Sequence, residues 1–133
     1  MDQSTILFDS SMGGLIATIA ALKAENIATL VLMATGLAIA KRWPDMLSLE
    51  EVINWKLSGE RKIYHHGYKE DRDLNYGFTE DLENHQTDNL KTNVKTLIFH
   101  LVSDEVVPIQ VSLDFVGANK NDSTLLHSKT VTT

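Results

Sequence analysis

The sequence contains no cysteine, only two prolines and no long hydrophobic run in its 133 residues. Without cysteine the chain has no disulfide and no thiol chemistry, which fits a reducing or an oxidising compartment equally well. The longest apolar stretch, residues 27–40, is shorter than the roughly 20 residues of a membrane-spanning helix, and Gly36 interrupts it. No basic segment precedes an apolar run at the N-terminus, so we expect no signal peptide and a soluble cytoplasmic protein.

Basic residues are too few and too scattered to form a nucleic-acid or membrane surface. The formal net charge is -6, from 12 lysines and arginines against 18 aspartates and glutamates. A nucleic-acid or anionic-membrane partner requires a basic patch, and we therefore expect neither. The length and the 43% hydrophobic content predict a single globular domain over residues 1–133.

A strand that breaks sharply into a helix opens the chain. Residues 5–8 are β-branched, aliphatic or aromatic and predict a buried strand, whereas apolar residues recur at helical spacing over residues 13–24. The break falls at Ser11. A turn of this kind exposes its residue at the carboxyl end of the strand, beside the free N–H groups of the helix start. A nucleophilic serine needs that placement, and Gly13 and Gly14 provide the small neighbours that so tight a turn requires.

Three further apolar segments predict a parallel sheet. Residues 27–33 read as a second buried strand, which completes a βαβ unit with a right-handed crossover. Residues 96–102 predict a third strand, followed by a turn over 103–108 and a helix over 109–116. Residues 123–127 predict a final strand, and His127 ends it. The fold class is therefore α/β.

The segment between the second and third strands, residues 44–93, reads as a helical insertion. Ser48 and Glu51 predict a capping box at the start of a helix that stops at Gly59. Residues 62–64 predict a short extended piece, residues 65–75 a polar loop, and residues 79–82 a short helix.

The insertion and its borders are the most aromatic part of the chain. They hold Trp43, Trp55, Tyr64, Tyr68, Tyr76 and Phe78. These side chains either line a substrate pocket or pack the insertion against its own domain, and the two interpretations have equal weight.

The segment Ser10-Ser11-Met12-Gly13-Gly14 resembles the nucleophile elbow of the α/β hydrolases, in particular the small esterase-like and serine-aminopeptidase-like members. One position departs from the usual Gly-x-Ser-x-Gly pattern, because Asp9 stands at the first glycine. The resemblance implies that Ser11 is the nucleophile and that the backbone N–H of Met12 is an oxyanion donor. It implies that the four predicted strands correspond to strands five to eight of the family's sheet, and that the family's earlier strands lie outside this sequence. It also implies that residues 44–93 form a lid-like insertion. Trp43, Trp55, Tyr76 and Phe78 would then bind substrate.

The segment after the third strand resembles the family's acid loop, and Asp104 matches the triad acid at its spacing from Val107-Pro108. Glu105 is the alternative acid, and Leu101 replaces a glycine of the pattern. The family places its histidine after the final strand, and His127 is the only histidine that follows Asp104. Residues 129–133 suggest a further hypothesis, because a shifted reading frame in their codons can encode a segment like the family's histidine loop.

The resemblance implies a serine hydrolase that acts on small carboxylic esters or amides without a cofactor or metal. Its activity is expected to be impaired, because the oxyanion loop of an early strand lies outside this sequence. The alternative is a non-catalytic domain with an exposed sheet edge through which copies self-associate. A metal site is a further alternative, since Asp71, Asp73 and Asn75 begin like a calcium loop beside His65-His66; Tyr76 and Leu82 then break that pattern.

Overall fold

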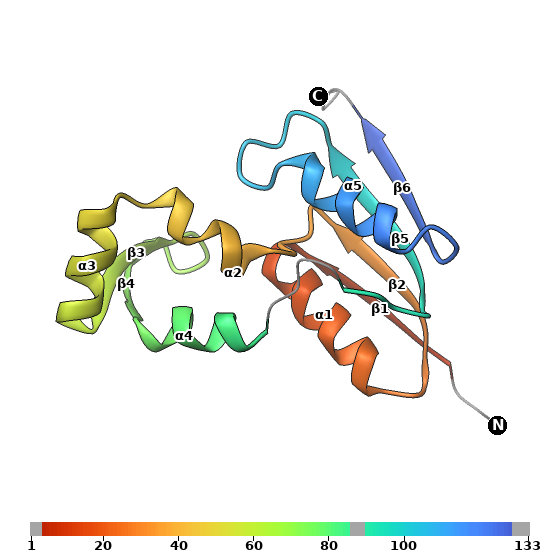
Figure 1. The fold of residues 1–133 in the computed structure, drawn as a ribbon, viewed down its shortest axis with the longest axis horizontal. Coiled ribbons are helices and arrows are strands. Elements are labelled where there is room, and N and C mark those ends of the chain that lie inside the picture. The colour runs from red at the N-terminus through yellow and green to blue at the C-terminus, as the bar shows by residue number, and fades with distance from the viewer. Residues whose placement is uncertain (1–3, 86–89, 129–133) are drawn as a thin grey trace. The chain divides into compact units, whose positions relative to one another are not determined.

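The computed structural model describes residues 4–85 and 90–128. These residues divide into two compact units. The first unit holds residues 4–37 and 90–128, and the second holds residues 38–85. Figure 1 shows a sheet with helices in the first unit and a smaller helix and hairpin assembly in the second.

The first unit is built on a four-stranded parallel sheet with the strand order β1-β2-β5-β6. These strands are β1 (Thr5–Ser10), β2 (Ile27–Met33), β5 (Lys95–Leu101) and β6 (Ser123–Ser128). All three pairings are parallel, so the α/β prediction and its four strands are confirmed. The register aligns Ser10 with Met33, Met33 with Phe99 and Phe99 with Leu126. The carboxyl ends of the strands therefore form one edge of the sheet.

Two helices lie against this sheet, α1 (Ser11–Lys23) on β1 and β2 and α5 (Ile109–Ala118) on β5 and β6 (Figure 1). Burial alternates along the central strands because successive side chains point to opposite faces. Leu30 and Leu32 of β2 and Ile98 of β5 are fully buried on one face. Leu15, Ala17 and Ala21 of α1 and Phe115 of α5 supply the rest of the core.

The second unit begins with α2 (Ile39–Arg42), a 3₁₀ turn η1 (Pro44–Met46) and α3 (Leu49–Ser58). The predicted capping box is present at the start of α3, where Ser48 accepts from the Glu51 N–H and the Glu51 carboxylate accepts from the Ser48 N–H. Gly59 ends the helix with φ 78°, a left-handed conformation that glycine adopts without strain. The unit closes with α4 (Gly77–Asn84).

The loop predicted for residues 65–75 was wrong, since most of it is one arm of a β-hairpin. β3 (Glu60–His65) pairs antiparallel with β4 (Glu70–Asn75), so the insertion is not purely helical. The strand β4 contains one large apolar side chain, Leu74, and gives no apolar alternation to detect. Cross-strand pairs stabilise it instead, including the ion pair between Lys62 Nζ and Asp73 Oδ1 at 3.4 Å.

The hairpin also bears on the metal alternative. Asp71, Asp73 and Asn75 lie along the extended strand β4 and do not form a loop. Among residues 4–85 and 90–128, no group of three histidine, aspartate or glutamate side chains could hold a metal ion. Within the same residues, every helix is too short or too polar to traverse a bilayer.

Candidate active site

Ser11 stands where β1 becomes α1. The strand ends at Ser10 and the helix begins at Ser11, whose φ is 50°. A residue with a side chain adopts this left-handed conformation at a cost of roughly 1–3 kcal/mol, so the surrounding structure must hold it there. The Gly36 N–H, just beyond β2, donates to the Ser11 carbonyl at 2.8 Å. Ser11 is exposed, as a nucleophile requires.

Two close contacts explain the small residues around Ser11. A side chain at Gly14 would collide with Thr35, which is fully buried beyond β2. A side chain at Gly13 would collide with the carboxylate of Asp9. Asp9 Oδ1 also accepts from the Ser10 N–H at 2.8 Å. The structure therefore accommodates Asp9 in place of a glycine because residue 13 has no side chain.

The backbone N–H of Met12 belongs to the first turn of α1. N–H groups in a first turn have no partner within the helix and carry the positive end of the helix dipole. Gly36 approaches this turn closely, since a Cβ built on it would lie 3.4 Å from the Met12 nitrogen. Met12 directly follows Ser11 in α1, and N–H groups at a helix start can bind anions.

Asp104 lies in the loop that follows β5, with 18% of its side chain exposed. Its Oδ1 accepts from the Val106 N–H at 2.9 Å and from the Val107 N–H at 2.8 Å. Both bonds fix the position of the carboxylate. Ser11 follows β1 and Asp104 follows β5, the first and third strands of the sheet. Two strand spacings, roughly 10 Å, separate these two strands. Glu105, the alternative acid, is exposed.

His100 is a site residue that the sequence analysis did not assign. It is 4% exposed on β5, and its Nε2 lies 2.7 Å from the Val107 carbonyl oxygen, which can only accept. Nε2 therefore carries a proton. Nδ1 lies 2.7 Å from the hydroxyl of Ser112 on α5, which is fully buried. His100 thus links the acid loop, through Val107, to β5 and α5. Its two ring nitrogens contact Val107 and Ser112 and not Ser11.

Asp104 Oδ2 lies 3.9 Å from His100 Nε2, beyond hydrogen-bond distance. His100 could have been noticed in the sequence, because it is a single histidine within an apolar run. Its partners, Val107 and Ser112, are apparent only in the structure.

His127 is an exposed residue of β6 and aligns with His100 on β5. Strand β6 is three spacings from β1, roughly 14 Å. That separation exceeds the reach of an imidazole, so the structure does not bring His127 to Ser11. Residues 129–133, on which the reading-frame hypothesis depends, lie outside the described part of the chain.

The predicted substrate-binding aromatics gather in one cluster of the second unit. Trp43 contacts Trp55 with ring centroids 6.3 Å apart and Phe78 at 5.7 Å, and Trp55 contacts Tyr76 at 5.5 Å. Trp55 is 2% exposed, and its indole N–H donates to the Leu74 carbonyl at 2.8 Å. Trp55 therefore packs the interior of its own unit.

Tyr64 and Tyr68 lie outside this cluster. Both are exposed on the hairpin, where Tyr64 contacts the ring of His66 in the turn and Tyr68 contacts the ring of His65 at the end of β3.

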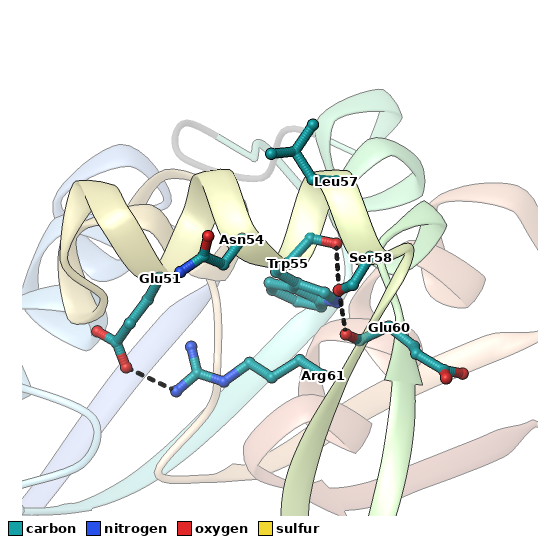
Figure 2. A pocket seen from close by; sticks show the side chains of 7 residues that line it. All are labelled: Glu51, Asn54, Trp55, Leu57, Ser58, Glu60 and Arg61. Atoms are coloured by element: carbon teal, nitrogen blue, oxygen red, sulfur yellow. Dashed lines mark hydrogen bonds and ion pairs between the residues drawn. The ribbon is translucent and has the colours of Figure 1, made fainter.

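A surface hollow of about 580 Å³ lies along α3 and the start of β3 (Figure 2). Its lining residues are Glu51, Asn54, Trp55, Leu57, Ser58, Glu60 and Arg61. An ion pair spans one side, with Arg61 Nη2 3.0 Å from Glu51 Oε1, as Figure 2 shows. Neither Ser11 nor Asp104 lines this hollow, whose residues all belong to the second unit.

Solved structures of known proteins share this fold. An inferred hydrolase from Agrobacterium vitis S4 superposes with a TM-score of 0.82 at 21% identity, over 97% of this chain and 54% of its own. Mouse alpha/beta hydrolase domain-containing protein 10 matches with a TM-score of 0.76 at 22% identity, over 96% of this chain and 53% of its own. A monoacylglycerol lipase of Paleococcus ferrophilus gives 0.63 at 15% identity, over 95% and 58%.

These likenesses establish the α/β-hydrolase fold for this chain. The chain spans about half the length of the structures that it resembles. No family model matches the sequence, and no curated protein matches it at a significant level.

Proposed function

We propose that this chain carries the nucleophile half of a serine hydrolase that acts on small carboxylic esters or amides through an acyl-enzyme. The observation that carries the proposal is the conformation of Ser11, held at φ 50° between a strand end and a helix start. Strained backbone of this kind persists where the surrounding structure enforces it, and it is frequent at active sites. The hydrolases and lipases of the same fold support the reaction class.

In this mechanism the Ser11 Oγ attacks the acyl carbonyl carbon and its proton passes to a general base. The carbonyl oxygen becomes an oxyanion, which the Met12 N–H stabilises. Collapse of the tetrahedral intermediate expels the alcohol or amine with that proton and leaves the acyl group on Ser11. Water then releases the acid by the same steps. Asp104 would orient the imidazole of the base and stabilise its charged form.

Two parts of this mechanism have no counterpart among the described residues, and we therefore propose impaired activity. His127 is the candidate base by sequence order, but it lies three strand spacings from Ser11. A second oxyanion donor is the other missing part. Loss of one such donor lowers kcat by roughly a hundredfold to a thousandfold, and loss of the histidine lowers it further.

The aromatic cluster is proposed as part of the substrate-binding wall through Trp43 and Phe78, which are less buried than Trp55. The Trp43 indole N–H is buried and has no hydrogen-bond partner among the described residues. A buried donor of this kind is costly to leave unpaired.

Covalent labelling tests the proposal more sensitively than turnover. A fluorophosphonate probe should label the full chain at Ser11, and Ser11→Ala should abolish the labelling. Ser10→Ala is the matched control, because Ser10 is the adjacent exposed hydroxyl and should leave labelling unchanged. Hydrolysis of a chromogenic short-chain ester should be slow and should fall to the background rate in Ser11→Ala.

Two results would overturn the proposal. The first is a probe adduct that forms equally well in Ser11→Ala. The second is a folded wild-type chain that forms no adduct and hydrolyses the ester no faster than Ser11→Ala; that result would favour the alternative, a non-catalytic domain of the same fold.

A further inference from the structure

The segment that follows β2 packs against the turn at Ser11, within the first unit. Ala34, the first residue of this segment, has a φ of 41°, and its N–H donates to the Phe99 carbonyl of β5 at 2.9 Å. Thr35 and Gly36 come next, and both are buried, Thr35 completely. The segment is therefore fixed to a central strand of the sheet before it reaches Ser11.

Gly36 contacts the peptide unit that joins Ser11 to Met12. The Gly36 N–H donates to the Ser11 carbonyl oxygen at 2.8 Å. A Cβ built on Gly36 would lie 3.3 Å from the carbonyl carbon and oxygen of Ser11 and 3.4 Å from the Met12 nitrogen. Gly36 therefore meets this peptide unit through a hydrogen bond and through close contact of its Cα.

The hydrogen bond to the Ser11 carbonyl also determines where the Met12 N–H points. A peptide unit is planar and trans, so its C=O and N–H point in opposite directions. Because the carbonyl is held toward Gly36, the Met12 N–H is directed away from Gly36. Rotation of this peptide unit would break the bond to Gly36 and turn the Met12 N–H out of that direction.

Strained backbone is concentrated at the same contact. Ser11, at φ 50°, accepts the bond from Gly36, and Ala34, at φ 41°, lies two residues before Gly36. Such conformations persist where surrounding contacts enforce them, and they cluster at functional sites. Among the described glycines, Gly59 is the one with a positive φ, so Gly36 is not left-handed. The missing side chain at residue 36 therefore serves the contact with the peptide unit and not the conformation of residue 36.

We propose that Gly36 is a positioning residue, which holds the peptide unit between Ser11 and Met12 so that the Met12 N–H faces the oxyanion formed from the substrate. This inference rests on the proposed function, because it gives Gly36 a part in the reaction of Ser11. The oxyanion forms only as Ser11 attacks. Misdirecting the Met12 N–H should therefore slow the chemical step and leave the initial binding of the substrate unchanged.

Gly36→Ala displaces this peptide unit without straining residue 36. The new methyl group meets backbone atoms at 3.3–3.4 Å, closer than ordinary van der Waals contact, so the peptide unit must shift by a few tenths of an ångström. A misplacement of about 1 Å can cost roughly a hundredfold in rate. The rate constant kinact for labelling of Ser11 by a fluorophosphonate should therefore fall by roughly fivefold to tenfold. The probe concentration that gives half of the maximal rate, KI, should stay unchanged.

Gly117→Ala is the matched control, because it makes the same change on α5 where there is room for it. A Cβ built on Gly117 meets no atom within 4 Å, and the φ of Gly117 is not positive. Both kinact and KI should stay unchanged in this variant. Circular dichroism and urea unfolding establish that each variant is folded. A loss of folded protein would lower the labelled fraction, whereas a misplaced N–H lowers kinact.

A scalar coupling across the hydrogen bond measures the contact directly and requires no activity. A long-range HNCO spectrum of the full wild-type chain should correlate the Gly36 amide with the Ser11 carbonyl carbon. The bond from Ala34 to Phe99 is the internal reference. A spectrum that shows the reference bond and lacks the bond from Gly36 to Ser11 overturns the proposal, even where Gly36→Ala does not fold.

Labelling separates the role of Gly36 from the proposed function. A wild-type chain that is labelled at Ser11, with the same kinact in folded Gly36→Ala, overturns the role of Gly36 and leaves Ser11 as the nucleophile. A fall in kinact that is equally large in Gly117→Ala, or a change confined to KI, overturns that role as well. A wild-type chain that forms no adduct at Ser11 overturns the proposed function, and the role of Gly36 with it.

Discussion

The carboxylate of Asp9 fills the space beside the Cα of Gly13, so the two residues fit together only because residue 13 has no side chain. Asp9 Oδ1 is held in that space by the Ser10 N–H, 2.8 Å away. Asp9 and Gly13 lie two residues before and two residues after Ser11. Their contact therefore flanks the turn in which Ser11 has its left-handed conformation.

Gly13→Ala should destabilise the fold by about 1–2 kcal/mol, because the new methyl group displaces the Asp9 carboxylate and breaks its bond to Ser10. In an Asp9→Ala background the same change should cost at least about 0.5 kcal/mol less, because the atoms that collide are absent. Urea unfolding of the four proteins of this double-mutant cycle measures the coupling. Equal costs in both backgrounds would show that Asp9 and Gly13 do not interact.

The buried pair His100 and Ser112 should contribute strongly to the stability of the first unit. His100→Leu leaves the Val107 carbonyl and the Ser112 hydroxyl without partners, which costs about 2–4 kcal/mol. Ser112→Ala removes one bond and should cost about 1–2 kcal/mol. In His100→Leu the Ser112→Ala change should cost almost nothing, because its partner is already lost.

Amide hydrogen exchange separates this local effect from global unfolding. The Val106 and Val107 amides, which donate to Asp104, should lose more protection in His100→Leu than the amides of β2. Uniform loss across the sheet would argue against a specific role of His100 in holding the acid loop.

The strands β1, β2 and β5 and the Ser11 turn were predictable because their signals are local. Apolar residues in β1, β2 and β5 appear as short continuous runs, and the break at Ser11 is followed by two glycines. The strand β4 was not predictable, because its conformation depends on pairing with β3 and on the bond from Trp55 to Leu74.

The His100 network was equally hidden, since its partners are 7 and 12 residues away along the chain. The register between non-consecutive strands places Met33 beside Phe99, and a single sequence does not specify that register.

Acid should weaken the start of α3. Hydrogen bonds from the Ser48 backbone N–H and hydroxyl hold the pKa of Glu51 below its ordinary value, and Arg61 adds to this effect. A carboxyl whose pKa is lowered in the folded state stabilises that state above its unfolded pKa, and the contribution is lost as the pH falls through the folded pKa.

A carbon-detected NMR titration should therefore report a depressed pKa for Glu51, and Ser48→Ala should raise that pKa. Ser58→Ala, at the other end of α3, is the matched control, because it should leave the Glu51 titration unchanged. An identical Glu51 titration in Ser48→Ala would mean that the capping box is absent in solution.

The two tryptophans should differ in what their indole nitrogens contribute. The Trp55 N–H donates to the Leu74 carbonyl, whereas the Trp43 N–H is buried without a partner. Trp55→Phe leaves a carbonyl of β4 unpaired and should cost about 1–3 kcal/mol more than Trp43→Phe, which removes an unsatisfied donor. Each variant keeps one tryptophan in the second unit, so its fluorescence during urea unfolding reports the stability of that unit. Equal stabilities would mean that the bond from Trp55 to Leu74 does not hold β4 against α3.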